Sequence, residues 1–269
     1  MTEDFKGFNV KITDKENEYN LAGTQNRLRA IFTIGLQDIF HSSINGISAE
    51  NSILLNDDTP VIVLVDRFND LTNLIKSYAA TASHEAGHAF GLHHQSFSGS
   101  NENGEFFLEL HPGVGEGPLS WGPIMGSPLT KSLTIWYESQ AQNDLGKLAE
   151  IINYKKDDHG NTFASAREFR WNTAKSGIIE QPGDVDVFSI DQSAYKKAKR
   201  ILLKSGGNSD FTIKLFNSRK NLVKTYDNPS SIDIDDAVNV FGTGKIYFQV
   251  SINSSIVPSK VGSYIIRVK

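Results

Sequence analysis

The chain has 269 residues, with 39% hydrophobic and 22% charged side chains and a net charge of −4. These values are typical of a soluble globular protein with room for two domains, and they give no reason to expect binding to nucleic acid or to an anionic membrane. The absence of cysteine excludes disulfide scaffolds, zinc–thiolate sites and thiol catalysis.

The N-terminal third of the sequence predicts strands followed by a long helix. Short β-type runs are "FNVKIT" from Phe8, "LRAIFTIGL" from Leu28, which is also compatible with a helix, and "TPVIVLVD" ending at Asp66. The last run is rich in β-branched residues, which is typical of a strand buried on both faces.

The helix is predicted between Asp70, a suitable N-cap, and Gly91, which can end it in a left-handed turn. Apolar residues recur there at helical intervals: Leu71, Leu74, Ile75, Tyr78, Ala79 and Ala82.

The middle of the chain predicts a loop and a second helix. Residues 96–120 contain five glycines and two prolines, which favours a loop. A helix is expected from about Ser139 to Ile152, because Leu145, Leu148 and Ile152 fall on one face.

The sequence pattern changes after residue 156. Short alternating runs separated by Gly, Asn, Asp and Pro, such as "DVDVFSID", "FTIKLFN" and "GSYIIRVK", predict an all-β sandwich or barrel. The charge changes too: residues 1–156 carry 11 basic and 19 acidic side chains, or −8, and residues 157–269 carry 16 and 12, or +4. We therefore expect an α/β (α+β) domain over 1–156 and a small β-sandwich over 157–269.

The stretch "SHEAGHAFGLHHQ" predicts a metal site. His84 and His88 are four residues apart, so they lie on the same face of a helix, one turn apart. Gly91 breaks the helix, which lets His94 return as a third nitrogen ligand. Three protein ligands with an open fourth position are typical of catalytic zinc. Glu85 is placed beside the metal, where it can act as general base toward an activated water.

This stretch reads H-E-x-x-H-x-x-G-x-x-H and resembles the signature of the metzincin zinc metallopeptidases. The resemblance implies one catalytic zinc on His84, His88 and His94, with Glu85 as base. It also implies a tight turn whose methionine lies beneath the metal; Met125, in "WGPIMGSP", fits this role, although it is also compatible with ordinary core packing.

Three positions near the signature do not follow the resemblance. His93 is expected to be a solvent-facing neighbour of the ligands. Ser127 stands where some metzincins have a tyrosine, and Gln95 follows the third histidine without matching a familiar subfamily. The subfamily is therefore not assigned, while the catalytic set is complete.

The second half resembles a bacterial pre-peptidase C-terminal domain, a small β-sandwich attached to many secreted peptidases. The likeness rests on "DDHGNTFASA" and "GDVDVFSI". Relatives of that domain are implicated in secretion or substrate binding, and some bind calcium. Carboxylates of the kind that Ca²⁺ prefers are present, although acidic residues are also ordinary turn formers: Asp157, Asp158, Asp184 and Asp186.

The predicted function is that of a secreted zinc endopeptidase acting on a protein or peptide substrate as a monomer. Two alternatives stay open: a catalytically silent, metal-bearing adhesion protein, and a zinc hydrolase of a non-peptide substrate. No apolar run approaches the roughly 20 residues of a membrane-spanning helix. The start, "MTEDFKGFNV", lacks the pattern of a signal peptide, so secretion is expected from the resemblance alone.

Overall fold

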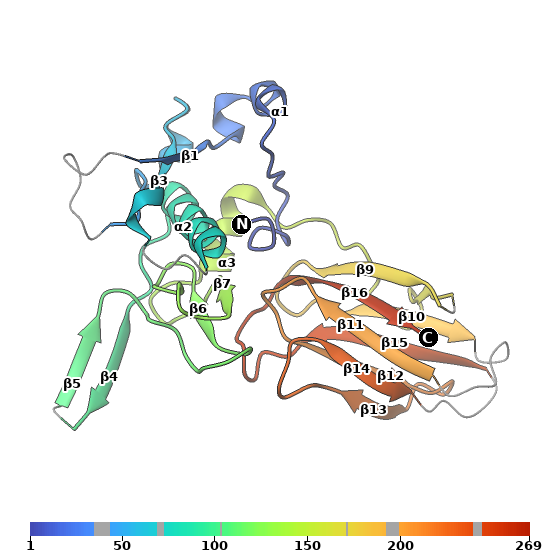
Figure 1. Ribbon diagram of the computed structural model, residues 1–269. Helices are drawn as coiled ribbons and strands as arrows, with labels where there is room; N and C mark the ends of the chain where they lie inside the picture. Colours follow the sequence, from blue (N-terminus) through green and yellow to red (C-terminus); the bar gives the residue numbers. More distant parts are fainter. Residues whose placement is uncertain (35–43, 69–72, 103, 171, 192–198, 239–243) are drawn as a thin grey trace. The chain divides into compact units, whose positions relative to one another are not determined.

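The structure is a computed structural model that describes residues 1–34, 44–68, 73–102, 104–170, 172–191, 199–238 and 244–269 (Figure 1). Two compact units are present. The first comprises Met1–Thr2, Val10–Gly115 and Trp121–Asn153, and the second comprises Glu3–Asn9, Glu116–Ser120 and Tyr154–Lys269. The division into domains 1–156 and 157–269 stays a prediction; in the described structure, a short N-terminal piece belongs to the second unit.

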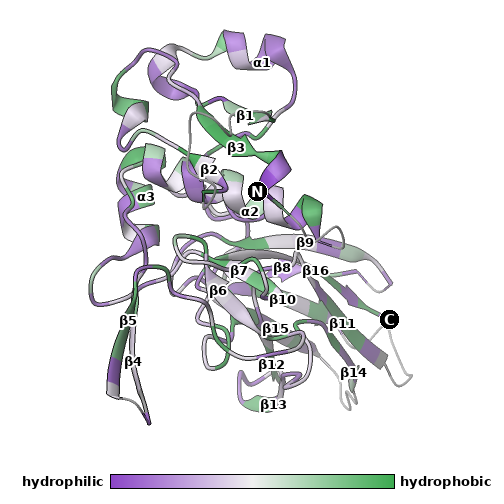
Figure 2. Ribbon diagram, turned by 60° about the vertical axis from the view of Figure 1, so that its left-hand side comes forward, coloured by the Kyte–Doolittle hydropathy of each residue, from purple (hydrophilic) through white to green (hydrophobic). Residues whose placement is uncertain are grey.

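A mixed three-stranded sheet forms one layer of the first unit. Its order is β1-β3-β2, with β1 (Ala30–Thr33) parallel and β2 (Gly46–Ile47) antiparallel to β3 (Val61–Leu64). Figure 2 shows β3 as a continuous hydrophobic strand, and its Val61, Val63 and Leu64 are fully buried. The β-branched run in the sequence therefore forms the central strand, as predicted.

The helix that follows, α2 (Leu74–Ala89), packs against β3 and β2. It ends in a Schellman motif, because the N–H of Leu92 bonds the carbonyl of Gly87 at 2.9 Å and the N–H of Gly91 bonds the carbonyl of His88 at 2.8 Å. Gly91 has φ +82°, as predicted for the residue that ends the helix. The predicted N-cap, Asp70, and Leu71 lie outside the described residues. The shorter helical segments of this unit are α1 (Glu16–Leu21), η1 (Thr24–Asn26), η2 (Ser52–Leu54) and η3 (Val65–Arg67).

For the middle of the chain, one prediction was wrong and one was confirmed except for its start. The segment expected to be a loop contains a hairpin of β4 (Phe97–Asn101) and β5 (Gly104–Leu108), and a short parallel pair, β6 (Trp121–Pro123) and β7 (Leu133–Ile135), follows. The second helix, α3 (Asp144–Ile152), begins five residues later than predicted. Asn143 caps it by accepting the N–H of Gly146 at 3.0 Å, which satisfies one of the free amides of the first turn.

The second unit is a two-sheet β-sandwich, which confirms the all-β prediction for the C-terminal part. One sheet has the order β13-β12-β15-β10-β8 and the other β14-β11-β16-β9. The strands are β8 (Arg167–Glu168), β9 (Ala174–Ile179), β10 (Asp186–Asp191), β11 (Lys199–Ser205), β12 (Phe211–Phe216), β13 (Leu222–Tyr226), β14 (Ile234–Val238), β15 (Lys245–Ile252) and β16 (Gly262–Val268).

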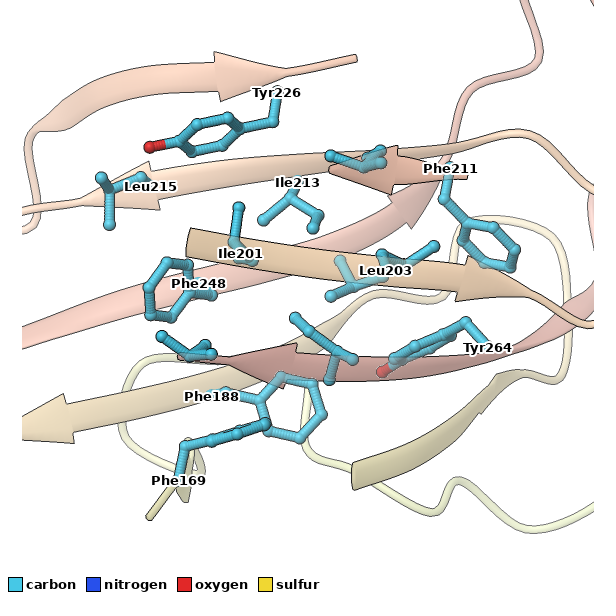
Figure 3. Close-up of a cluster of buried hydrophobic side chains, with 14 of the residues drawn as sticks. Phe169, Phe188, Ile201, Leu203, Phe211, Ile213, Leu215, Tyr226, Phe248 and Tyr264 are labelled. Atoms are coloured by element: carbon cyan, nitrogen blue, oxygen red, sulfur yellow. The ribbon is translucent and has the colours of Figure 1, made fainter. Parts of the chain in front are cut away.

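Aromatic and branched side chains fill the space between these sheets (Figure 3). Phe188 and Phe248 are fully buried, and they come from neighbouring strands at directly opposed positions. Ile201 and Tyr264 meet them from the other sheet. Alternation along β12, where every second residue is buried, produces this inward face.

Truncation of this core is expected to destabilise the second unit strongly. Phe188→Ala removes a fully buried ring, which typically costs about 3–5 kcal/mol. Ile265→Ala on β16 is the matched control, because Ile265 is 51% exposed. Urea unfolding of the two variants measures the difference; equal stabilities would contradict this description of the core.

The run "FNVKIT" does not form the predicted strand. Phe8 makes a single antiparallel bridge with Tyr154, and the two rings stack with centroids 5.1 Å apart. Phe8 is fully buried, and Glu3 of the same segment accepts hydrogen bonds from the amide and hydroxyl of Ser263. These contacts make residues 3–9 part of the second unit. Among the described residues, no helix is long and apolar enough to cross a membrane.

Candidate metal centre

The three predicted ligand histidines converge at the end of α2. The side-chain nitrogens of His84, His88 and His94 that face one another lie within 4.8 Å. The Nε2 atoms of His88 and His94 are 3.2 Å apart. The Schellman turn at Gly91 reverses the chain, so the third histidine reaches the helix face that carries the first two.

Each of these rings is held through its other nitrogen. Nδ1 of His84 lies 2.7 Å from the carbonyl of Ile124, and Nδ1 of His88 lies 2.7 Å from the carbonyl of Leu92. A carbonyl only accepts hydrogen bonds, so both Nδ1 atoms carry the proton and both Nε2 atoms keep a free lone pair. Burial lowers the pKa of His84 to about 3, which keeps this ring neutral and able to bind a metal.

The side chain of Glu85, on α2, faces β2, which has one bonded neighbour in the described part of the sheet. It is buried, and a Cβ built on Gly46 of β2 would lie 2.6 Å from its Oε1. A larger residue at position 46 would therefore force this carboxylate to move. Burial raises the pKa of Glu85 to about 8. In the metal-free site, burial thus disfavours the charged form of this carboxylate, and a cation bound beside it would favour that form.

Met125 is fully buried in a turn that Gly126 closes by bonding the carbonyl of Pro123 at 2.9 Å. A Cβ built on Gly87 would overlap the Sδ atom of Met125. The methionine therefore packs directly against α2 between the turns that carry His84 and His88.

Gln95, which sequence reasoning did not explain, is the centre of a buried polar network. Its Nε2 donates to Oδ1 of Asp144 at 2.7 Å and to the carbonyl of Gln142 at 3.1 Å. Its backbone N–H bonds the carbonyl of Met125 at 2.7 Å. The residue after the third histidine thus fixes that segment to both the methionine turn and the start of α3.

His93 and Ser127 are not members of the histidine cluster. For His93, exposure to solvent was predicted. The imidazole of His93 is 64% exposed, and its Nδ1 lies 3.4 Å from Oε1 of Glu50. Ser127 donates its backbone N–H to the carbonyl of His111 at 2.8 Å.

A second group of side chains that could hold a metal ion lies in the second unit. Its members form two adjoining sets, Asp157–Glu180–Asp184 and Asp158–His159–Asp186. Three buried oxygens have no hydrogen-bond partner among the described residues: Oε2 of Glu180, Oδ1 of Asp184 and Oδ1 of Asp186. Glu180 was not predicted; it follows β9 directly. Nε2 of His159 donates to the carbonyl of Ser176 at 2.9 Å, so this ring nitrogen already has a partner.

No family model and no curated protein matches the chain. Among solved structures, the pre-peptidase C-terminal domain of a collagenase from Bacillus anthracis is 19% identical, with a TM-score of 0.33; the match covers 43% of this chain and 100% of that domain. Two structures of PliG, a periplasmic inhibitor of g-type lysozyme, each match 39% of this chain. The Aeromonas hydrophila protein is 13% identical (96% covered, TM-score 0.29) and the Salmonella Typhimurium protein 14% identical (98% covered, TM-score 0.26). Likenesses this weak assign neither a family nor an activity to the chain.

Proposed function

We propose that the protein is a zinc-dependent endopeptidase of the metzincin type. The observation that carries the proposal is the convergence of His84, His88 and His94 beside the buried carboxylate of Glu85. The resemblance of the sequence to the metzincin signature points to the same chemistry, and a methionine turn packed under α2 accompanies it.

The donor set suits zinc. Neutral imidazole nitrogens bind Zn²⁺ at about 2.0–2.1 Å, so two of them in a tetrahedral site lie roughly 3.3 Å apart. The Nε2 atoms of His88 and His94 are separated by 3.2 Å. Both of the ring nitrogens that bond backbone carbonyls point away from this centre, which leaves the metal-binding nitrogens free. Three ligands also leave a position open for water or substrate.

Glu85 is the residue that moves the proton in this proposal. When bound, zinc would supply Lewis-acid activation of water and of the scissile carbonyl. Glu85 accepts the proton of the attacking water and returns it to the leaving amine.

The edge strand β2 is the surface on which an extended substrate would pair. The central strand β3 cannot be this surface, since it is bonded to β1 on one side and β2 on the other. Within the described part of the sheet, β2 has one bonded neighbour and carries Gly46 against Glu85. A peptide added to β2 by backbone pairing would therefore pass the general base.

The test is proteolysis of denatured casein by the full chain. Newly released α-amino groups are counted for the purified protein, after chelation, and after addition of one equivalent of zinc. We expect cleavage that the chelator abolishes and zinc restores. A zinc-loaded chain inert toward casein and peptide libraries would favour an adhesion protein, and hydrolysis of non-peptide amides alone would favour the other zinc hydrolase. Secretion and a monomeric state belong to the same proposal.

We also propose that the acidic group of the second unit binds Ca²⁺. The supporting observation is the set of buried carboxylate oxygens without a hydrogen-bond partner among the described residues. Leaving a charged group buried without a partner costs free energy, and a bound cation would remove that cost. Ca²⁺ takes six to eight oxygen ligands. Glu180 directly follows β9 and Asp184 lies just before β10, so with Asp157 they could hold one ion between the two strands; Asp186, the first residue of β10, belongs to the adjoining set.

Calcium is expected to raise the melting temperature more at pH 8 than at pH 5. Burial raises the pKa of Asp186 from 3.8 to about 8, so without a cation the folded state holds a proton that the unfolded chain releases. The cation-free protein should therefore lose stability as pH rises through this window. Calcium competes with that proton and should offset the loss. Thermal unfolding with and without calcium at both pH values measures this, with Asp186→Asn as control; an identical shift at the two pH values would contradict it.

A further inference from the structure

The three candidate ligands differ in what holds their Nδ1 atoms. His84 and His88 each face a backbone carbonyl at 2.7 Å, supplied by the buried residues Ile124 and Leu92. His94 instead faces a side chain: Oε1 of Glu109 lies 3.3 Å from its Nδ1. Glu109 is 80% exposed, and among the described residues it pairs with this histidine.

The hairpin explains how Glu109 reaches this position. Phe97 of β4 pairs with Leu108 of β5, so the residues just outside the hairpin return to the same place. The N–H of His111 continues the pairing by bonding the carbonyl of Gln95 at 2.7 Å. Glu109 thus stands across from the segment that carries His94, at the base of the hairpin. In Figures 1 and 2 the hairpin extends away from α2 and the small sheet.

We propose that Glu109 is a positioning residue for the metal centre, which orients His94 and strengthens its bond to zinc. This inference rests on the proposed zinc site. A carboxylate that accepts the Nδ1 proton fixes the tautomer in which Nε2 carries the lone pair. It also raises the electron density on that nitrogen, and loss of such a partner typically weakens metal binding about 10–100-fold.

The arrangement makes the hairpin part of the metal centre. The two carbonyl partners belong to the methionine turn and to the end of α2, which are buried and fixed. The third partner, Glu109, is exposed and directly follows the hairpin that leaves the site at Phe97 and returns at Leu108. A change in the position of this hairpin would therefore act on one ligand and leave the other two in place.

The experiment compares zinc binding by the full-length wild type and three variants. Glu109→Ala removes the acceptor, Glu109→Gln keeps an oxygen acceptor without the charge, and Glu105→Gln is the matched control. Glu105 is an exposed residue of β5 with no histidine partner among the described residues. Zinc dissociation constants are measured by competition with a chromophoric chelator, and the visible spectrum of the cobalt-substituted protein reports the ligand geometry.

We expect the zinc dissociation constant to rise about 10–100-fold in Glu109→Ala, to take an intermediate value in Glu109→Gln, and to stay unchanged in Glu105→Gln. The cobalt spectrum should shift in the same order. The melting temperature of the metal-free protein should not change, because the Glu109 side chain is exposed.

Two results would overturn the inference in distinguishable ways. If the wild type binds zinc and Glu109→Ala binds it equally well with an unchanged cobalt spectrum, Glu109 does not position His94. If the wild type itself binds no stoichiometric zinc, the proposed function fails and the inference fails with it. A fall in affinity accompanied by a lower melting temperature of the metal-free variant would assign Glu109 to folding and would also contradict the proposal.

Discussion

Replacement of Glu85 by glutamine is expected to abolish peptide hydrolysis while zinc binding is retained. Glutamine has nearly the same shape and fits between α2 and Gly46, but it cannot accept the proton of the attacking water. Loss of a general base typically costs about 10²- to 10⁴-fold in rate. The effect should fall on kcat, with KM little changed, because the carboxylate acts in the transition state.

Steady-state kinetics on a fluorogenic peptide, together with zinc competition, measure both parts of this expectation. Glu50→Gln is the matched control, since Glu50 is an exposed glutamate beside His93. Without metal, the Glu85→Gln variant should also become more stable than the wild type as pH rises from 4.5 to about 8, because the folded wild type there holds a proton that the unfolded chain releases. A variant that cleaves as fast as the wild type would remove Glu85 from the mechanism.

The second large effect, on zinc affinity, is expected for substitution of His94, the third proposed ligand. His94→Ala should lose zinc affinity by more than the roughly 10–100-fold typical of residues that only support a ligand. The neighbouring substitution His93→Ala should leave affinity unchanged, because that imidazole is 64% exposed and its Nδ1 faces Glu50. The pair is closely matched, since both changes remove one imidazole at adjacent positions.

Zinc content after dialysis, and the rise in melting temperature on addition of zinc, report the difference. A ligand present at about 1,000 times its dissociation constant stabilises a protein by about 4 kcal/mol, so the wild type and His93→Ala should both show a clear rise. The His94→Ala variant should show little. Equal rises in the two variants would show that His94 is not a ligand.

The local part of the site could be predicted because helix geometry depends on neighbouring residues. The offset of four between His84 and His88 and the glycine at position 91 fix the helix face and its end. The start of α3 was misplaced because the signal was a single Asn143 cap within a polar stretch. The hairpin was read as a loop, although Asn103–Gly104 is a dipeptide typical of tight hairpin turns.

The rest of the site depends on residues far apart in the chain. Within the site, Gln95 bonds Asp144, which lies 49 positions away in the chain. In the fold of the second unit, Phe8 likewise stacks on the distant residue Tyr154. Periodicity along one chain does not reveal such pairs. Glu109 is recognisable only once the hairpin register is known, because nothing in its local sequence distinguishes it from Glu105.

The most direct test of the proposed zinc endopeptidase activity is to compare peptide-bond cleavage by wild type and Glu85→Gln at matched zinc occupancy. Both proteins are loaded to one zinc per chain, and new α-amino groups released from casein are counted over the same time. We expect continuous release by the wild type and about 10²- to 10⁴-fold slower release by the variant. No release by the zinc-loaded wild type, or equal release by the two proteins, would contradict it.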